Sequence, residues 1–138
     1  DATGNRTSGG LGCAACHAAP EFDIDPNTLS NGIGGSINGG PDFTNTRAPS
    51  LRDLVKPDAT TNGPMMHTGV ITSLQAAIGH YGNLTAAIGN PNLDPRLKPN
   101  GFGQQLHLNA TEINAMIAFL QTLSGTNVYS DTKWSNPF

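Results

Sequence analysis

The chain has 138 residues, of which 36% are hydrophobic and 12% charged, and its formal net charge is -3. This composition is typical of one compact domain, and no run reaches the roughly 18 apolar residues that a membrane-spanning helix needs. The seven Lys and Arg residues provide no basic surface for nucleic acid or anionic lipid. We therefore expect no nucleic-acid partner and no membrane insertion.

The first residues along the chain, 1–10, are rich in Gly, Ser, Thr and Asn, which is typical of a flexible linker. We expect them to precede a single domain over residues 11–138. They contain no basic stretch followed by an apolar one, so we expect any export signal to have been removed. The 17 Gly and 10 Pro of the chain predict many turns, long loops and a thin apolar core.

Both cysteines of the chain lie in one motif, Cys13-Ala-Ala-Cys16-His17. Cys-x-x-Cys-His is the attachment signature of haem c, in which both thiols bond to the porphyrin and the histidine ligates the iron. On one helical turn the two sulfurs share a face and the histidine projects beside them. The sequence therefore predicts one haem c, covalently bound through Cys13 and Cys16, with His17 as the proximal iron ligand.

Three other interpretations of the cysteine pair are a structural disulfide, half of a zinc site and a thioredoxin-like redox pair. A zinc site needs further thiolates or imidazoles at short spacing, but His67, His80 and His107 lie far apart in the sequence. A thioredoxin-like pair needs a βαβ unit, and the chain has no alternating or β-branched run that predicts one. These considerations favour haem c.

The elements expected around the motif are short. We expect a helix over residues 11–18, a long Gly- and Asn-rich loop over 20–46, and a second short helix over 49–55 that begins with a proline.

Two longer helices are expected in the second half of the chain, and each begins with a predicted capping box. The first starts at Thr72 and stops at Gly82, with an apolar face of Leu74, Ala77, Ile78 and Tyr81. The second runs from Asn109 towards Gly125, with a core stripe of Ile113, Met116, Ile117, Leu120 and Leu123. Together the expected elements predict an all-α, cytochrome c-like domain that surrounds one haem and has long Gly-, Pro- and Asn-rich loops.

The order and spacing of several segments add a family resemblance. The chain resembles the C-terminal haem domain of bacterial di-haem cytochrome c peroxidases and their relatives in the MauG group. The segments that carry the resemblance are Cys13–His17, Arg47–Arg52, Met66–Gly69, Ser73–Tyr81, Asn90–Leu97 and Ala118–Gly125.

The chain also departs from that family. Family enzymes carry two haems, whereas these residues contain one attachment motif and four histidines. The usual acidic residue after the Met-His pair is Thr68, and the usual aromatic residue before it is Met65. The resemblance therefore implies that the electron-transfer half is retained and that the two-haem peroxidase mechanism is not available within this chain.

Two residues are the main candidates for the sixth iron ligand. The family's distal ligand corresponds to Tyr81, which helical periodicity also turns inward, whereas Met66 offers the thioether common in single-haem electron carriers. We favour Tyr81 slightly over Met66, and place Met65, His67 and His80 below both. A phenolate would lower the reduction potential, and a thioether would raise it.

Arg47 and Arg52 are the candidates to bind the haem propionates, since a guanidinium matches a carboxylate. The alternative is a surface ion pair with Asp53 or Asp42.

The predicted function is electron transfer by a periplasmic or secreted, bacterial, mono-haem cytochrome domain. The domain is expected to be monomeric, either on its own or as a module of a longer protein. Its expected partner is a redox protein, for example a copper-dependent polysaccharide monooxygenase. The alternatives are a MauG-like peroxidase and a haem-based ligand sensor.

Overall fold

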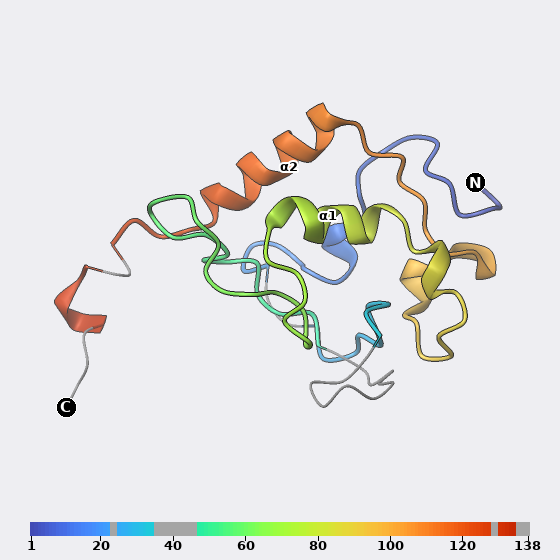
Figure 1. Cartoon of the computed structure of the whole chain (residues 1–138), viewed down its shortest axis with the longest axis horizontal. Helices are drawn as coiled ribbons and strands as arrows, with labels where there is room; N and C mark the ends of the chain where they lie inside the picture. Colours follow the sequence, from blue (N-terminus) through green and yellow to red (C-terminus); the bar gives the residue numbers. More distant parts are fainter. Residues whose placement is uncertain (23–24, 35–46, 128–129, 135–138) are drawn as a thin grey trace.

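The computed structural model describes residues 1–22, 25–34, 47–127 and 130–134. Two α-helices dominate it, α1 (Leu74–Gly82) and α2 (Ala110–Thr122), and Figure 1 shows α2 lying across one side of α1. Single 3-10 turns make up the other helical elements, at Cys13–Ala15, Thr85–Ala87, Pro95–Leu97, Pro99–Gly101 and Thr132–Trp134. Within these residues no helix is both long and apolar enough to cross a membrane.

The expected all-α class is wrong. In the described ranges, α1 has 9 residues and α2 has 13, and most of the remaining chain is turn and loop. Isolated β-bridges join loops that are distant in sequence, among them Ser30 with Leu93 and Asn5 with Gln105. Gly, Pro and Asn favour turns over helix, so loops paired by such bridges take the place of further helices.

Both helices form in the predicted segments, and the cap of α2 is the predicted one. Asn109 and Glu112 make the capping box of α2 that the sequence predicts. At α1 the cap lies one residue later than expected, because the side chain of Ser73, not Thr72, accepts from the Ala76 backbone N–H. An N-cap needs extended backbone, which Ser73 has.

A small core lies between α1 and α2. Leu74 and Ile78 of α1 pack with Leu120 of α2 and with Val55, and each of the four is less than a tenth exposed. The other stripe residues of α2 that the sequence predicted, Ile113, Met116, Ile117 and Leu123, pack against this cluster. The predicted apolar face of α2 is therefore confirmed, and so are Leu74 and Ile78 of the predicted α1 face, whereas Ala77 and Tyr81 of that face are half-buried and lie outside this cluster.

The short helix expected over residues 49–55 is absent, and the segment forms a turn that ends in a bridge between Val55 and Thr61. Asp53 lies in the left-handed region with φ of 55°, which ends any helix there. Its backbone N–H donates to the Leu123 carbonyl, and its carboxylate accepts from the Gly125 N–H. Contacts with the end of α2 therefore determine this conformation.

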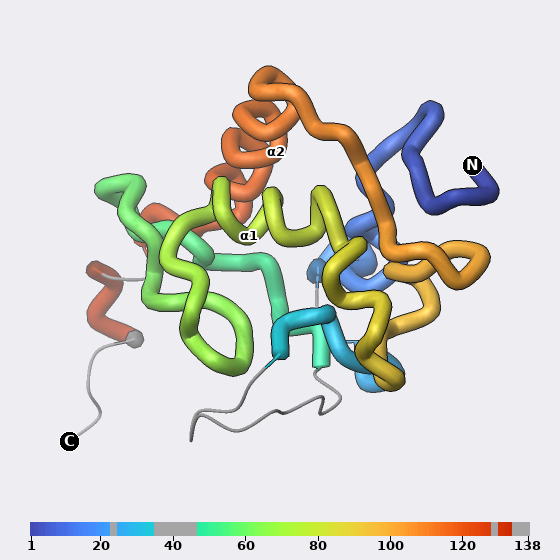
Figure 2. Tube along the Cα trace, turned by 45° about the vertical axis from the view of Figure 1, so that its right-hand side comes forward, coloured from blue at the N-terminus to red at the C-terminus, as the bar shows by residue number. Residues whose placement is uncertain are grey.

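Residues 4–6 contact the body of the domain. The Arg6 backbone N–H donates to the Gln105 carbonyl at 2.8 Å, and the Arg6 guanidinium pairs with Glu112 of α2 at 2.5 Å. Further along, Ser30 pairs with Leu93, and Figure 2 shows the two segments that carry them below α1, on the side away from α2.

Candidate functional site

The cysteine motif forms a single tight turn. Residues Cys13–Ala15 are a 3-10 helix, preceded by Gly12 with φ of 76°, a left-handed conformation that favours glycine. The His17 backbone N–H donates to the Cys13 carbonyl at 2.9 Å, which extends the turn to the histidine. The helix expected over 11–18 is thus shorter than predicted, but the motif residues share one turn of backbone.

Cys13 and Cys16 are both free thiols. Partial burial raises the pKa of each thiol; at Cys16 the positive charge of Arg96 opposes this effect. Both therefore remain protonated near neutral pH. In the described part of the chain, no cluster of three or more His, Cys, Asp or Glu residues could hold a metal ion.

His17 is half-buried, and burial lowers the pKa of its imidazole, while the Pro49 backbone has a smaller, opposite effect. The ring is therefore neutral at neutral pH. Its Nδ1 atom is buried and makes no hydrogen bond of standard geometry with the described residues. A neutral imidazole with an unsatisfied buried nitrogen beside two free thiols fits the donor set of haem c.

An ion-pair network centred on Arg96 contacts the cysteine motif. The Arg96 guanidinium pairs with Asp94 at 2.8 Å and with Asp25 at 2.7 Å. Its Nη1 also donates to the backbone carbonyl of Ala15, between the two cysteines, at 2.8 Å. The Asp94 side chain is only 4% exposed, and its hydrogen bonds with Arg96 lower its pKa to about 2. A partly buried charge network therefore holds the motif turn through the Ala15 carbonyl.

Asn31 lies beside the two main candidates for the sixth ligand, Met66 and Tyr81. The Asn31 side-chain nitrogen donates to the Met66 sulfur at 3.2 Å, and the same side chain hydrogen-bonds Tyr81. Burial raises the pKa of Tyr81, and the hydrogen bond with Asn31 partly offsets this. Tyr81 also lies within electrostatic range of Cys13 and Cys16. The structure therefore places the Met66 sulfur at Asn31, whose backbone carbonyl contacts His80, the neighbour of Tyr81 on α1.

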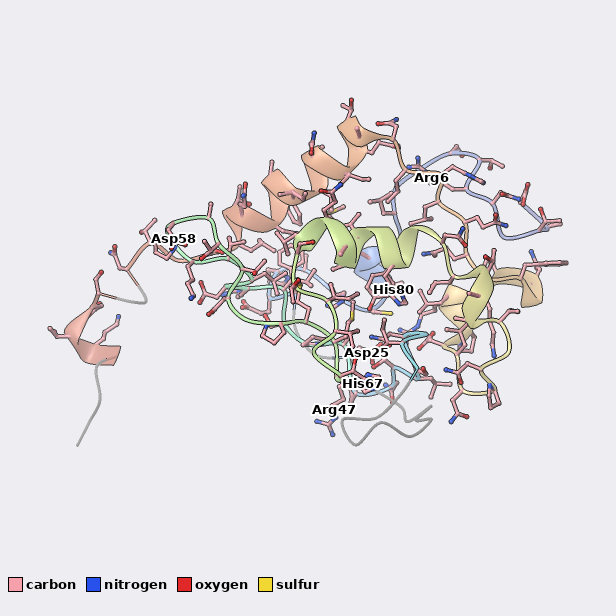
Figure 3. The ribbon with its side chains drawn as sticks, in the orientation of Figure 1. Arg6, Asp25, Arg47, Asp58, His67 and His80 are labelled. Carbon is pink, nitrogen blue, oxygen red and sulfur yellow. The ribbon has the colours of Figure 1, made fainter. Side chains whose placement is uncertain are left out.

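The other histidines have different surroundings. His80 lies on the side of α1 away from α2, as Figure 3 shows, and its Nε2 contacts the Asn31 carbonyl at 2.8 Å. A carbonyl only accepts, so Nε2 of His80 carries the proton and has no lone pair for iron. His67 and His107 are exposed, and His107 is bonded to the Asn5 side chain.

The two arginines proposed for the propionates are both exposed. Arg52 pairs with Glu21 at 2.5 Å and donates to the backbone carbonyls of Pro20 and Glu21. It thus takes part in a surface ion pair, although with Glu21 and not with Asp53; Asp42 lies outside the described residues. Binding of the propionates by Arg47 and Arg52 remains a prediction.

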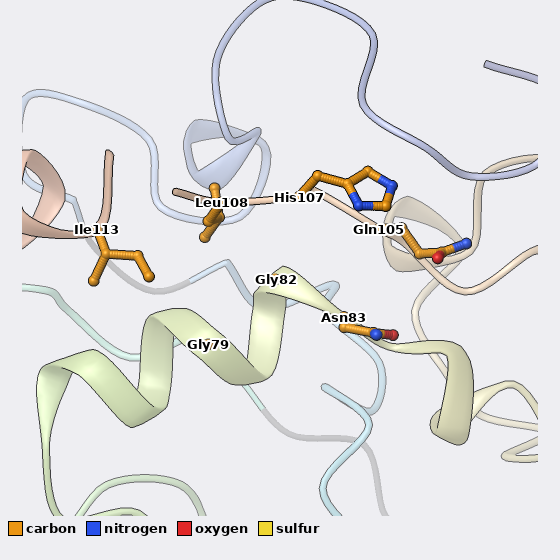
Figure 4. A pocket seen from close by; sticks show the side chains of 7 residues that line it. All are labelled: Gly79, Gly82, Asn83, Gln105, His107, Leu108 and Ile113. Carbon is orange, nitrogen blue, oxygen red and sulfur yellow. The ribbon is translucent and has the colours of Figure 1, made fainter. Parts of the chain in front are cut away.

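Two surface hollows of the described residues have neither cysteine in their lining. One, of about 250 Å³, lies between α1 and the segment before α2, and Figure 4 shows Gly79, Gly82 and Leu108 on its walls. Another, of about 270 Å³, is lined by Leu11 and by Met116 and Phe119 of α2. Neither contains a candidate iron ligand.

Reasoning from the sequence did not identify Asn31 or Arg96 as site residues. Asn31 stands in a Gly- and Asn-rich loop without a recognisable motif. Arg96 belongs to the Asn90–Leu97 segment that carries part of the family resemblance, and that segment was the available signal.

Comparison with known proteins supports the family resemblance. No protein-family model matches the sequence. The methylamine utilization protein MauG of Methylorubrum extorquens is 32% identical over 125 residues, which are 84% of this chain and 32% of that protein. MauG of Methylophilus methylotrophus is 31% identical over 121 residues, which are 82% of this chain and 32% of that protein. The fold resembles that of a MauG-like protein associated with microbial copper homeostasis, with a TM-score of 0.52 and 24% identity, covering 92% of this chain and 46% of that one.

These relatives represent a class of haem-based redox proteins. Within that class, the chain is related to the MauG-like cytochrome c peroxidases, which confirms the resemblance seen in the sequence. It spans about a third of the length of the curated relatives.

Proposed function

We propose that the chain is a c-type haem domain that transfers single electrons to or from a partner redox protein. The observation that carries this proposal is the turn that holds the free thiols of Cys13 and Cys16 beside the neutral imidazole of His17. When bound, one haem would supply the one-electron couple. Cys13 and Cys16 would hold it covalently, and His17 would ligate the iron.

Electron transfer is favoured over catalysis because two candidate iron ligands lie close to Asn31. Met66 and Tyr81 both contact this residue, so the sixth position has a ligand at hand. Iron with both axial positions filled does not bind peroxide or carbon monoxide without losing a ligand. The relationship to MauG-like peroxidases supports peroxidase activity as the second candidate, and a ligand sensor is the third.

We place the domain in the periplasm or outside the cell of a bacterium, in agreement with its MauG relatives. Its partner would dock through a small polar and apolar surface around the haem edge, because electron-transfer encounters are weak and brief. A copper-dependent polysaccharide monooxygenase is one partner of this kind.

The test is production of the domain in a bacterial host with a cytochrome c maturation system. We expect a red protein with the mass of the chain plus one haem, and a reduced spectrum typical of haem c. The matched variant Cys13→Ser with Cys16→Ser should lack covalent haem. A colourless wild-type product would refute the proposal.

The oxidised and reduced forms separate the three functions. A spectrum that peroxide and carbon monoxide both leave unchanged supports electron transfer. A rapid spectral change with peroxide supports a peroxidase, and binding of carbon monoxide without turnover supports a sensor.

A further inference from the structure

We propose that three charged residues beside the haem-attachment turn, Asp25, Asp94 and Arg96, set the reduction potential of the haem that the domain would bind. These three residues form the charge cluster. Arg96 raises the potential, and the two carboxylates lower it. This inference rests on the proposed haem function and gives the charge cluster an electrostatic role that is separate from its contribution to stability.

The charge cluster contacts the turn that would hold the haem. Nη1 of Arg96 donates to the backbone carbonyl of Ala15 at 2.8 Å. Ala15 stands between the two cysteines that would bond to the macrocycle. The positive charge of Arg96 also acts on the Cys16 thiol, where it opposes the rise in pKa that burial causes. The charges of the cluster therefore lie at short range from the attachment site, where Coulomb interactions are strong.

Hydrogen bonds hold these charges in fixed positions. Nε and Nη2 of Arg96 donate to the two carboxylate oxygens of Asp94, each at 2.8 Å, and Nη1 donates to Asp25 at 2.7 Å. The Asp94 carboxylate also accepts from the Leu29 backbone N–H at 2.9 Å, and the Asp94 side chain is only 4% exposed. Partly buried charges are screened by water and salt much less than surface charges, so their field extends to neighbouring groups.

The charge cluster is negative as a whole at neutral pH. Hydrogen bonds with Arg96 lower the pKa of Asp25, and they lower the pKa of Asp94 to about 2, so both carboxylates are ionised. Two carboxylates and one guanidinium together carry a formal charge of -1. Negative charge near a haem stabilises ferric over ferrous iron, because the ferric form carries the additional positive charge. The complete cluster therefore lowers the potential, and each member contributes according to the sign of its own charge.

The test is redox titration of the haem-loaded wild type and of two variants, at pH 8, where carboxyl groups are ionised. Asp25→Asn removes one negative charge, so we expect a higher potential than in the wild type. Arg96→Gln removes the positive charge, so we expect a lower potential. Loosening of the haem surroundings would shift both potentials in the same direction, and shifts of opposite sign therefore identify charge as the cause.

Two further variants serve as controls. Arg96→Lys keeps the positive charge but loses the planar fork that binds both oxygens of Asp94, so its potential should stay close to that of the wild type although urea unfolding shows lower stability. Asp58→Asn removes the same charge as Asp25→Asn from an exposed position, which Figure 3 shows well apart from Asp25. It should shift the potential much less than Asp25→Asn.

Shifts of the same sign in Asp25→Asn and Arg96→Gln would overturn the inference and leave the haem function intact, and so would shifts no larger than that of Asp58→Asn. If Arg96→Gln yields no haem-loaded protein, Asp25→Asn and Arg96→Lys decide. A raised potential in the first and a wild-type potential in the second support the inference, and any other combination overturns it. A wild type without haem would overturn both the proposed function and the inference.

Discussion

Arg96 donates a 2.8 Å hydrogen bond to the carbonyl of Ala15, 81 residues earlier in the chain and between the two cysteines. The same guanidinium pairs with the buried Asp94 and with Asp25. One side chain thus connects the haem-attachment turn to Asp25 and to Asp94.

Replacing Arg96 with glutamine removes the partner of a buried carboxylate and the contact with Ala15. We expect the free energy of unfolding to fall by about 2–3 kcal/mol and the yield of haem-loaded protein to fall with it. Urea unfolding and the haem-to-protein absorbance ratio measure the two effects. Lys133→Gln, in an exposed pair of 3.7 Å, is the control and should change stability by less than about 0.5 kcal/mol. Equal effects of the two substitutions would contradict the role of Arg96.

Asp94 should make the domain sensitive to acid in a defined range. Hydrogen bonds with Arg96 lower its pKa from 3.8 to about 2 in the folded state. A carboxylate with a lowered folded pKa contributes stability that is complete above the unfolded pKa and is lost as the pH falls towards the folded pKa. We therefore expect unfolding titrations between pH 5 and 2 to show a loss of about 2 kcal/mol. Asp94→Asn should remove this part of the pH dependence, and an unchanged slope would refute the assignment.

The two candidate ligands differ in their effect on the reduction potential. Tyr81→Phe removes an anionic donor that stabilises ferric iron, so we expect a higher potential and a changed spin-resonance spectrum. Met66→Leu should leave both unchanged. Redox titration of the two variants provides the measurement, and the reverse pattern would assign the iron to Met66.

The start of α1 provides a test of local structure. The Ser73 side chain accepts from the Ala76 N–H, so Ser73→Ala should cost about 1 kcal/mol of unfolding free energy. Thr72→Ala is the matched control, because Thr72 lies before the cap, and it should be nearly neutral. A larger loss for Thr72→Ala would support the cap position expected from the sequence.

Gly103 lies where a side chain cannot fit. A Cβ atom there would be 2.3 Å from the Leu84 carbonyl oxygen. We expect Gly103→Ala to destabilise the domain by about 3 kcal/mol in urea unfolding, because backbone atoms cannot move aside cheaply. Gly89, whose added Cβ would meet nothing within 4 Å, is the control and should tolerate alanine. Equal stability of the two variants would show that this loop packs differently.

Several features of the domain follow from the sequence alone, since each depends on residues within one or two turns of the backbone. The spacing of Cys13, Cys16 and His17 predicts the attachment turn. The pattern from Asn109 to Leu120 predicts both the cap and the apolar face of α2, and Ile78 lies on the predicted face of α1. Such patterns are local, so they can be recognised before the fold is known.

The remaining features were determined by the tertiary structure. Asp53 forms a turn in place of a helix because it bonds residues at the end of α2, 72 positions away at Gly125. Asn31 meets Met66, and Arg96 meets Ala15, across 35 and 81 residues. Contacts over such separations form only when the whole chain closes its loops, and no local preference for helix or turn encodes them. The haem motif and the candidate ligands Met66 and Tyr81 could therefore be recognised in the sequence, whereas the contacts of Arg96 with Ala15 and of Asn31 with Met66 became visible only in the fold.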